Sequence, residues 1–124
     1  MTTRSSATVR SADGTSIAYT RRGTGPAVIL IDGALCHRGM GPNFELGGLL
    51  AERGLTTYVY DRRGRGESGM TGPYALEREV EDVAALLEAA GGSAALFGIS
   101  SGAALALEAA AVLDGIDRVI CFEP

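Results

Sequence analysis

The residues with the clearest chemical meaning lie in the run Gly98–Ile99–Ser100–Ser101–Gly102, which fits the pattern G-x-S-x-G. The apolar run 94–97 predicts a buried strand before the pattern, and the apolar run 101–113 predicts a helix after it. Small residues on both sides of the central serine avoid collisions where a strand turns abruptly into a helix. Such a turn presents the Ser100 hydroxyl at a helix N-terminus, where amide N–H groups favour developing negative charge. Ser100 is therefore the candidate nucleophile.

A serine nucleophile needs backbone N–H groups that hold the negatively charged oxygen formed during acyl transfer. Ser101 does not occupy the central position between the glycines, and its expected contribution is its backbone N–H. The second donor is expected from the loop after the apolar run 27–31, where Gly33 lets the backbone turn closely and the Ala34 N–H is the natural donor. The alternative is that both loops are ordinary turns, with a serine that only caps a helix.

A third loop, residues 61–72, is rich in glycine and arginine. Its segment 64–69 has the pattern G-x-G-x-x-G directly after a strand-like run, which is the dinucleotide-binding fingerprint. That fingerprint requires the glycines to open a helix, whereas Gly72 and Pro73 intervene here. Nucleotide binding is therefore the weaker alternative. We expect a structural loop in which Asp61 and the neighbouring arginines form hydrogen bonds beside the site.

The rest of the sequence shows which elements position these loops. Asp13–Gly14, between two short extended runs, predicts a β-hairpin. Strand-like runs then alternate with stretches of helical spacing, so the expected order after the hairpin is β, α, β, α, β, α, β. This alternation predicts an α/β fold with a mostly parallel sheet and flanking helices, preceded by the antiparallel hairpin. The expected elements are strands at 27–31, 56–60, 94–97 and 118–122, and helices at 43–53, 76–90 and 101–113.

For two of the helices, the sequence also predicts how they are capped or buried. Asn43 is expected to cap the first helix, which Gly54 ends. The helix 101–113 is apolar on nearly every side and is therefore expected to be buried. In parallel sheets, active sites lie beyond the carboxyl ends of the strands. The three loops described above all fall at that edge, so the fold is expected to bring the candidate residues together.

Composition narrows the class of protein. The 124 residues are 46% hydrophobic and 21% charged, as in a soluble globular domain. The net charge is −4 and the basic residues are dispersed arginines apart from the loop 61–72, so nucleic acid is not an expected partner. No apolar run is long enough to span a membrane and residues 1–10 lack the core of a secretory signal, so we expect a cytoplasmic protein without a membrane partner. Cys36 and Cys121 are expected to be free thiols, and neither a metal nor a cofactor is predicted.

The three loops, in this order, resemble those of the α/β-hydrolase family, and the resemblance covers essentially the whole chain. Its specific parts are the run 98–102 and the segment 61–68, which looks like the family's D-x-R-G-x-G-x-S. The run 98–102, which we call the elbow, and the alanine-rich helix that follows it are most similar to those of small bacterial esterases and non-haem haloperoxidases. The resemblance implies that Ser100 attacks the acyl carbon of a small ester or related substrate. It argues against epoxide or haloalkane hydrolysis, for which related members use aspartate at that position.

The chain departs from the family's pattern at two places. Asp32–Gly33 stands where many members have His-Gly, a change that leaves the backbone donor in place. The family's acid and histidine follow the serine, but no histidine follows Ser100. The single histidine, His37, would need a new geometry and an orienting carboxylate to act as a base, so we expect it to line a pocket or to be exposed. Some members place the acid after the strand that follows the elbow helix, which makes Glu123 the candidate acid.

The resemblance also implies that residues 1–124 form a single partial α/β-hydrolase domain, without the lid, the last strands and the C-terminal helices. The strand at 118–122 would then present an open apolar edge. We therefore expect the chain to be poorly soluble, oligomeric, or completed by its missing C-terminal half or by another chain. The leading hypothesis is a serine hydrolase of a small molecule whose histidine and acid come from sequence outside this chain. The alternatives are a non-catalytic binding or scaffold protein and an inactive fragment.

Overall fold

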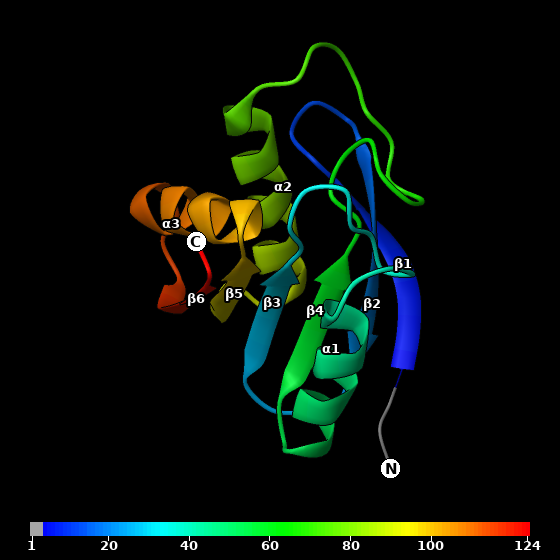
Figure 1. Ribbon diagram of the computed structural model, residues 1–124. Helices are drawn as coiled ribbons and strands as arrows, with labels where there is room; N and C mark the ends of the chain where they lie inside the picture. The colour runs from blue at the N-terminus through cyan, green and yellow to red at the C-terminus, as the bar shows by residue number, and fades with distance from the viewer. Residues whose placement is uncertain (1–3) are drawn as a thin grey trace.

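A single six-stranded sheet runs through the computed structural model, which describes residues 4–124 (Figure 1). The strands lie in the order β1-β2-β4-β3-β5-β6. Along the chain, strands and helices follow one another in the order predicted from the sequence. The elements are β1 (Arg4–Arg10), β2 (Ser16–Arg22), β3 (Ala27–Ile31), α1 (Asn43–Glu52), β4 (Thr56–Tyr60), α2 (Leu76–Ala89), β5 (Ala94–Ile99), α3 (Ser101–Val112) and β6 (Ile116–Phe122).

The sheet begins with the predicted hairpin. β1 and β2 pair antiparallel, and Gly14 in the turn has a φ of 87°, a left-handed conformation that glycine adopts without a steric penalty. The Thr15 N–H donates a hydrogen bond of 3.0 Å to Asp13 Oδ1, which fixes the turn. β2 pairs antiparallel with β4, whereas β3 pairs parallel with β4 and β5, and β5 pairs parallel with β6. The predicted α/β class, with a mostly parallel sheet after an antiparallel hairpin, is confirmed.

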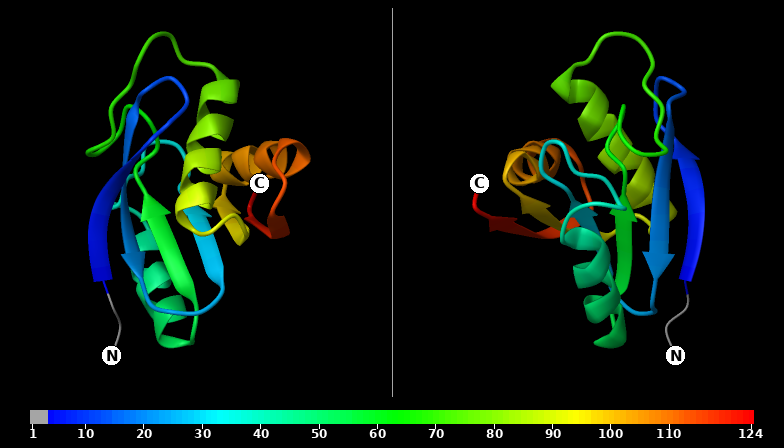
Figure 2. Two further views of the ribbon diagram at one scale, coloured as in Figure 1. Left: turned by 180° about the vertical axis from the view of Figure 1, so that it is seen from behind. Right: turned by 45° about the vertical axis from the view of Figure 1, so that its right-hand side comes forward.

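Helices cover both faces of the sheet, which explains why β3 is apolar at every position. α1 lies on one face, and α2 and α3 lie on the other (Figure 2). Val28 and Leu30 of β3 belong to the core on the α1 face. The alternating residues Ile29 and Ile31 belong to the larger core on the opposite face. The strand therefore contributes to both cores with the two-residue period of a β-strand.

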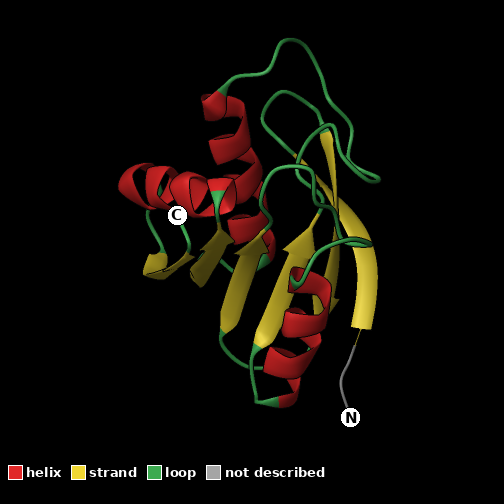
Figure 3. Ribbon diagram, viewed as in Figure 1, coloured by secondary structure: helices red, strands yellow, loops and turns green. Residues whose placement is uncertain are grey.

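The parallel strands β3, β4, β5 and β6 run in the same direction, so their carboxyl ends meet at one edge of the sheet (Figure 3). The loop after β3, the loop after β4 and the turn between β5 and α3 all leave from this edge. These are the three segments in which the sequence places the candidate residues. The topology therefore brings them to a common edge, as predicted.

Two predictions about the helices are wrong in detail. Asn43 does not cap α1: Pro42 occupies the capping position, and Asn43 is a buried first helical residue whose side chain makes no capping hydrogen bond. α3 is only half buried, because it packs with one face and leaves Leu107 and Val112 largely exposed on the other. Despite this apolar character, none of the helices within residues 4–124 is long and apolar enough to cross a membrane.

β6 forms one edge of the sheet in the described chain. Ile120 and Phe122 are 49% and 55% exposed, and they alternate with the half-buried Val119 and Cys121. The exposed side chains therefore lie on the face of β6 that α3 does not cover. The open apolar edge expected from the sequence is present among the described residues.

Truncating a buried leucine on α2 should destabilise the fold strongly. Leu86 is fully buried in the larger core, so we expect Leu86→Ala to lower the free energy of unfolding by about 2–5 kcal/mol. The control Leu49→Ala alters an exposed leucine of α1 and should change that free energy by less than about 0.5 kcal/mol. Urea unfolding followed by circular dichroism measures both values. Equal losses in the two variants would contradict the packing of α2 on this core.

Candidate active site

Ser100 stands at the junction between β5 and α3 in a strained backbone conformation. β5 ends at Ile99 and α3 begins at Ser101, so the chain changes from strand to helix at a single residue. Ser100 has a φ of 56° and a ψ of −119°, values that residues with a side chain rarely adopt. Its side chain is exposed and makes no capping hydrogen bond. The hydroxyl is therefore available to a bound molecule at the carboxyl edge of the sheet.

The two glycines of the motif let three backbone segments touch at this junction. A Cβ atom on Gly98 would overlap the carbonyl group of Gly102. A Cβ atom on Gly102 would overlap the carbonyl oxygens of Ile31 and Asp32, where β3 ends. A side-chain rotation does not relieve an overlap between Cβ and backbone atoms, so a larger residue would push α3 away from the sheet. The glycine spacing seen in the sequence is thus a packing requirement of this junction.

The two predicted N–H donors lie on the segments that meet at Ser100. Gly33 packs against the elbow, because a Cβ atom built on it would lie 3.5 Å from the Ser100 Cβ. The next residue, Ala34, is exposed, and its N–H donates no hydrogen bond within residues 4–124. Ser101 is the first residue of α3, so its N–H has no partner within the helix. The structure therefore brings the predicted nucleophile and both predicted donors to one place.

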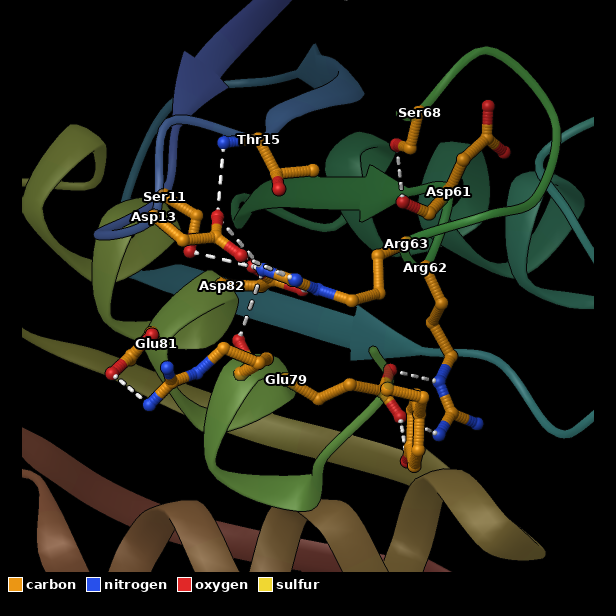
Figure 4. Close-up of polar contacts among 12 residues, drawn as sticks. Ser11, Asp13, Thr15, Asp61, Arg62, Arg63, Ser68, Glu79, Glu81 and Asp82 are labelled. Atoms are coloured by element: carbon orange, nitrogen blue, oxygen red, sulfur yellow. Dashed lines mark hydrogen bonds and ion pairs between the residues drawn. The ribbon is translucent and has the colours of Figure 1, made fainter. Parts of the chain in front are cut away.

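A buried arginine connects the two segments that carry these donors. Arg62 Nη1 donates to the carbonyl oxygen of Asp32 at 3.0 Å and to Ser101 Oγ at 2.9 Å. Its Nε and Nη2 donate to the two carboxylate oxygens of Glu79, both at 2.7 Å (Figure 4). Burial opposes both charges, but the hydrogen bonds and attraction between them outweigh it. The pKa of Arg62 is therefore raised and the pKa of Glu79 is lowered.

The neighbouring arginine is directed to other carboxylates. Arg63 donates to the two oxygens of Asp82 at 2.7 and 2.9 Å, and its Nη1 donates to Asp13 Oδ2 at 2.8 Å. Figure 4 shows Arg62 and Arg63 leaving the loop in different directions, each toward its own acidic partner. Arg63 therefore ties the loop to α2 and to the first hairpin, and none of these partners belongs to the elbow.

Asp61 and the neighbouring arginines are all hydrogen-bonded, as expected from the sequence, but Asp61 does not pair with the adjacent arginines. Its carboxylate instead accepts hydrogen bonds from the backbone N–H and Nε of Arg38, at 2.6 and 3.1 Å, and from the Glu67 N–H at 2.9 Å. The Asp61 carbonyl oxygen accepts the Ser68 hydroxyl at 2.5 Å. Asp61 therefore organises the loop itself and joins it to the loop after β3, whereas the arginines reach to α2.

Sequence reasoning missed the acidic partners on α2. Glu79 and Asp82 lie three positions apart and are buried on the same side of α2 as Val80 and Val83. A carboxylate on the buried side of a helix requires a cation or hydrogen-bond donors, because an unpaired buried charge is costly. An acidic residue within the apolar stripe was therefore the available signal, and the arginine-rich loop was the available source of cations.

His37 does not engage Ser100. Its Nδ1 accepts the Gly39 N–H at 3.0 Å, and no hydrogen bond in the described chain joins the ring to the serine. The imidazole instead lines a pocket of about 590 Å³ together with Arg38 and Glu67, and Ser100 is not among the lining residues. The expectation that His37 lines a pocket is confirmed, and this pocket is separate from the elbow.

Glu123 lies beside the elbow through its backbone. The preceding residue, Phe122, accepts the Ser100 N–H on its carbonyl oxygen at 3.0 Å. Glu123 itself is exposed and has a φ of 48°, so the chain turns directly after β6. The predicted acid is thus at the same edge of the sheet as the predicted nucleophile.

Asp32 is an acidic side chain buried at the end of β3. It is 1% exposed, and no group among residues 4–124 hydrogen-bonds its Oδ2. Burial raises the pKa of Asp32 to about 6. The neighbouring Asn43 amide offsets part of this rise, although no hydrogen bond of good geometry joins the two side chains. A carboxyl group with a raised pKa therefore lies two residues before Ala34, the predicted donor.

No metal centre is formed within the described part of the chain. Residues 4–124 contain no group of three or more histidine, cysteine, aspartate or glutamate side chains placed to hold a metal ion. Cys36 and Cys121 are free thiols, and each is partly exposed. The candidate site consists of a serine hydroxyl, two backbone N–H groups and the arginine that connects their segments.

The alpha/beta hydrolase family model matches residues 33–123 of the chain. This range contains the elbow, the loop that carries Ala34 and the arginine-rich loop. The fold and the matched range together define the class: the chain belongs to the α/β-hydrolase family. No curated protein matches it.

Solved structures support the same assignment. An α/β hydrolase from Sphaerobacter thermophilus is 53% identical, with a TM-score of 0.88 over 95% of this chain and 45% of that one. The bottromycin epimerase BotH, solved with bottromycin A2, is 36% identical, with a TM-score of 0.82 over 94% of this chain and 47% of that one. Epoxide hydrolase A from Mycobacterium thermoresistibile is 25% identical, with a TM-score of 0.84 over 96% and 39%. The chain spans less than half the length of each of these proteins.

The buried carboxyl group of Asp32 should make stability depend on pH. Its pKa is higher in the folded chain than in the unfolded chain, so the folded state binds more protons between about pH 4 and pH 6 and loses stability as the pH rises through that window. We expect the free energy of unfolding of the wild type, measured relative to Asp32→Asn, to fall by about 2 kcal/mol between pH 4 and pH 8. Urea unfolding of both proteins at several pH values measures this difference. Parallel curves for the two proteins would contradict the raised pKa.

Proposed function

We propose that this protein is a serine hydrolase that acts on a small ester or related acyl substrate, with Ser100 as its nucleophile. The observation that carries the proposal is the positive φ of Ser100 at a strand-to-helix junction, with a hydroxyl that no group among residues 4–124 hydrogen-bonds. Backbone strain of this kind costs about 1–3 kcal/mol and persists only where the surrounding structure imposes it. A serine that merely capped α3 would have an extended backbone and would bond the helical N–H groups, and Ser100 does neither.

In the proposed reaction, Ser100 Oγ forms a bond to the acyl carbon while its proton passes to a base. The carbonyl oxygen becomes an oxyanion and accepts hydrogen bonds from the N–H groups of Ala34 and Ser101. The N-terminus of α3 adds a favourable dipole for the same negative charge. The alcohol then leaves with a proton, and water attacks the acyl-enzyme to release the acid and restore the serine.

The base and the acid complete the proposed site. We propose that a histidine outside this chain, on a continuation of the polypeptide or on a partner chain, accepts the Ser100 proton. This is supported by the state of His37, whose Nδ1 is engaged by the Gly39 N–H in a different pocket. Glu123 is the proposed acid because its backbone adjoins the elbow. The open edge of β6 is the surface on which the additional sequence would pack.

An ester is favoured over an epoxide as the substrate class. A carboxylate nucleophile would be needed at position 100 for the epoxide chemistry of related family members, and this chain has a hydroxyl there. The similarity to epoxide hydrolases is 25% in sequence identity and supports the fold rather than the substrate. The hydroxyl and the two N–H groups suit a planar acyl group that becomes tetrahedral.

A second candidate is a non-catalytic binding or scaffold role within the same fold. The observation that favours it is the arrangement of the single histidine, which forms no hydrogen bond with Ser100 in the described chain. Fold alone does not guarantee catalysis. The two candidates differ in the reactivity of Ser100, which can be measured directly.

A fluorophosphonate probe should form a covalent adduct on Ser100 of the protein in its natural full length. We expect mass spectrometry to locate the adduct on the peptide that contains residue 100. The variant Ser100→Ala should lose the adduct and all ester turnover, with a change in the free energy of unfolding below about 1 kcal/mol, because it keeps the Cβ atom and removes only the hydroxyl of an exposed residue. The control Ser93→Ala removes an exposed serine at the opposite end of β5 and should label like the wild type.

Two results would count against the proposal. Labelling or turnover retained by Ser100→Ala would place the nucleophile elsewhere. A folded wild-type protein without any adduct would favour the binding or scaffold role.

A further inference from the structure

We propose that Arg62 is a positioning residue that sets the relative placement of the two oxyanion donors, an inference that rests on the proposed function of Ser100. Arg62 comes from the loop after β4 and carries neither donor. Its Nη1 nevertheless reaches both segments, through the carbonyl oxygen of Asp32 on one side and the hydroxyl of Ser101 on the other. One guanidinium nitrogen thus bridges the loop after β3 and the first residue of α3.

Hydrogen bonds to other residues fix the orientation of the Arg62 guanidinium. Glu79 accepts from both Nε and Nη2 in a bidentate pair, which fixes the plane of the group. Tyr74 donates its hydroxyl proton to Glu79 Oε2 at 2.6 Å and steadies the carboxylate. Each of the two Nη1 protons then has its own acceptor. Because Arg62 and Glu79 are 4% and 2% exposed, little water is available to replace these bonds.

The positions of the two acceptors explain why the bridge matters for the donors. The Asp32 carbonyl belongs to the peptide group just before the one that carries the Ala34 N–H, and only the Cα of Gly33, which is buried against the elbow, lies between them. Ser101 Oγ belongs to the residue that supplies the other donor. Arg62 therefore restrains both donors against the same rigid group. Displacements of about 1 Å in a catalytic arrangement can lower rates by roughly 100-fold.

Arg63 offers a matched control within the same loop. It is also 4% exposed and forms a bidentate pair with a buried carboxylate of α2, Asp82. Its other contacts go to the first hairpin and to the Arg78 carbonyl oxygen. None of these partners belongs to the elbow or to the loop after β3. Arg63 thus shares the charge, burial and structural role of Arg62 but lacks its connection to the donors.

The experiment compares two pair replacements in the full-length protein. Arg62→Met with Glu79→Leu removes the bridge without leaving an unpaired buried charge, and Arg63→Met with Asp82→Leu does the same for the control. The measurements are the rate of fluorophosphonate labelling of Ser100, kcat and KM for p-nitrophenyl acetate, and the ¹⁵N order parameters of the Ala34 and Ser101 amides. Arg62→Lys and Arg63→Lys, which keep the charge but lose the planar fork, repeat the comparison if a pair variant does not fold.

We expect the Arg62 pair variant to label at least about tenfold more slowly than the wild type, with kcat reduced and KM changed by less than about threefold. Its Ala34 and Ser101 order parameters should fall from about 0.85 toward 0.6. The Arg63 pair variant should have a thermal stability comparable to that of the Arg62 pair variant, while its labelling rate stays within about twofold of the wild type and its order parameters stay unchanged. Equal labelling by the two pair variants would overturn the inference.

The two readouts separate this inference from the proposed function. If the folded wild type does not label at Ser100, the proposed function fails, and the order parameters alone decide the role of Arg62. Amides loosened only in the Arg62 variants would then still support the bridge, and unchanged amides would overturn it. If the wild type labels and the Arg62 variants behave like the Arg63 variants, the proposed function stands and the inference fails.

Discussion

The contact between Gly102 and the carbonyl oxygens of Ile31 and Asp32 sets how closely α3 approaches the end of β3. On the other side of the elbow, Gly98 meets the Gly102 carbonyl in the same way. Because neither glycine has a Cβ, the backbones of β3, of the elbow and of α3 come into direct contact. Ser100 lies between them with a positive φ. The exposed hydroxyl and the adjacent N–H groups all follow from this close approach. The geometry of the candidate site therefore depends first on the packing of these backbones and only then on the side chains that it presents.

Two buried ion pairs hold the loop after β4 in place at the same edge of the sheet. Arg62 and Arg63 are enclosed with Glu79 and Asp82, and each guanidinium binds its carboxylate in a bidentate fork. Such pairs add little net stability compared with apolar residues of similar size, but breaking one by removing a single partner is costly. Their contribution here is geometric, because they fix where the loop after β4 lies. Of the two arginines, only Arg62 also hydrogen-bonds to the segments that meet at Ser100.

The features that could be predicted from the sequence depend on local pattern. Asp13–Gly14 specifies a turn that needs a positive φ, and the glycines around Ser100 specify a close approach of backbones. The alternation of strand-like and helical runs was sufficient for the α/β class. Each of these inferences uses residues that are neighbours in the chain.

The features that the sequence did not reveal depend on contacts across space. Arg62 and Glu79 are 17 residues apart, and nothing local shows that this arginine pairs with α2 rather than with Asp61. Asn43 is buried beside Asp32 instead of capping α1, which depends on how the helix is placed on the sheet. The composition of α3 indicated burial, but only the tertiary arrangement shows that one of its faces remains uncovered.

The most direct test of the central claim is a crystal structure of the full-length protein with a phosphonate bound covalently to Ser100, because the tetrahedral phosphorus mimics the proposed intermediate. The mechanism predicts that the phosphoryl oxygen lies between the backbone nitrogens of Ala34 and Ser101, at about 2.7–3.1 Å from each. An oxygen that points away from both nitrogens would contradict the assignment of the donors. A phosphonate attached to a residue other than Ser100 would contradict the assignment of the nucleophile itself.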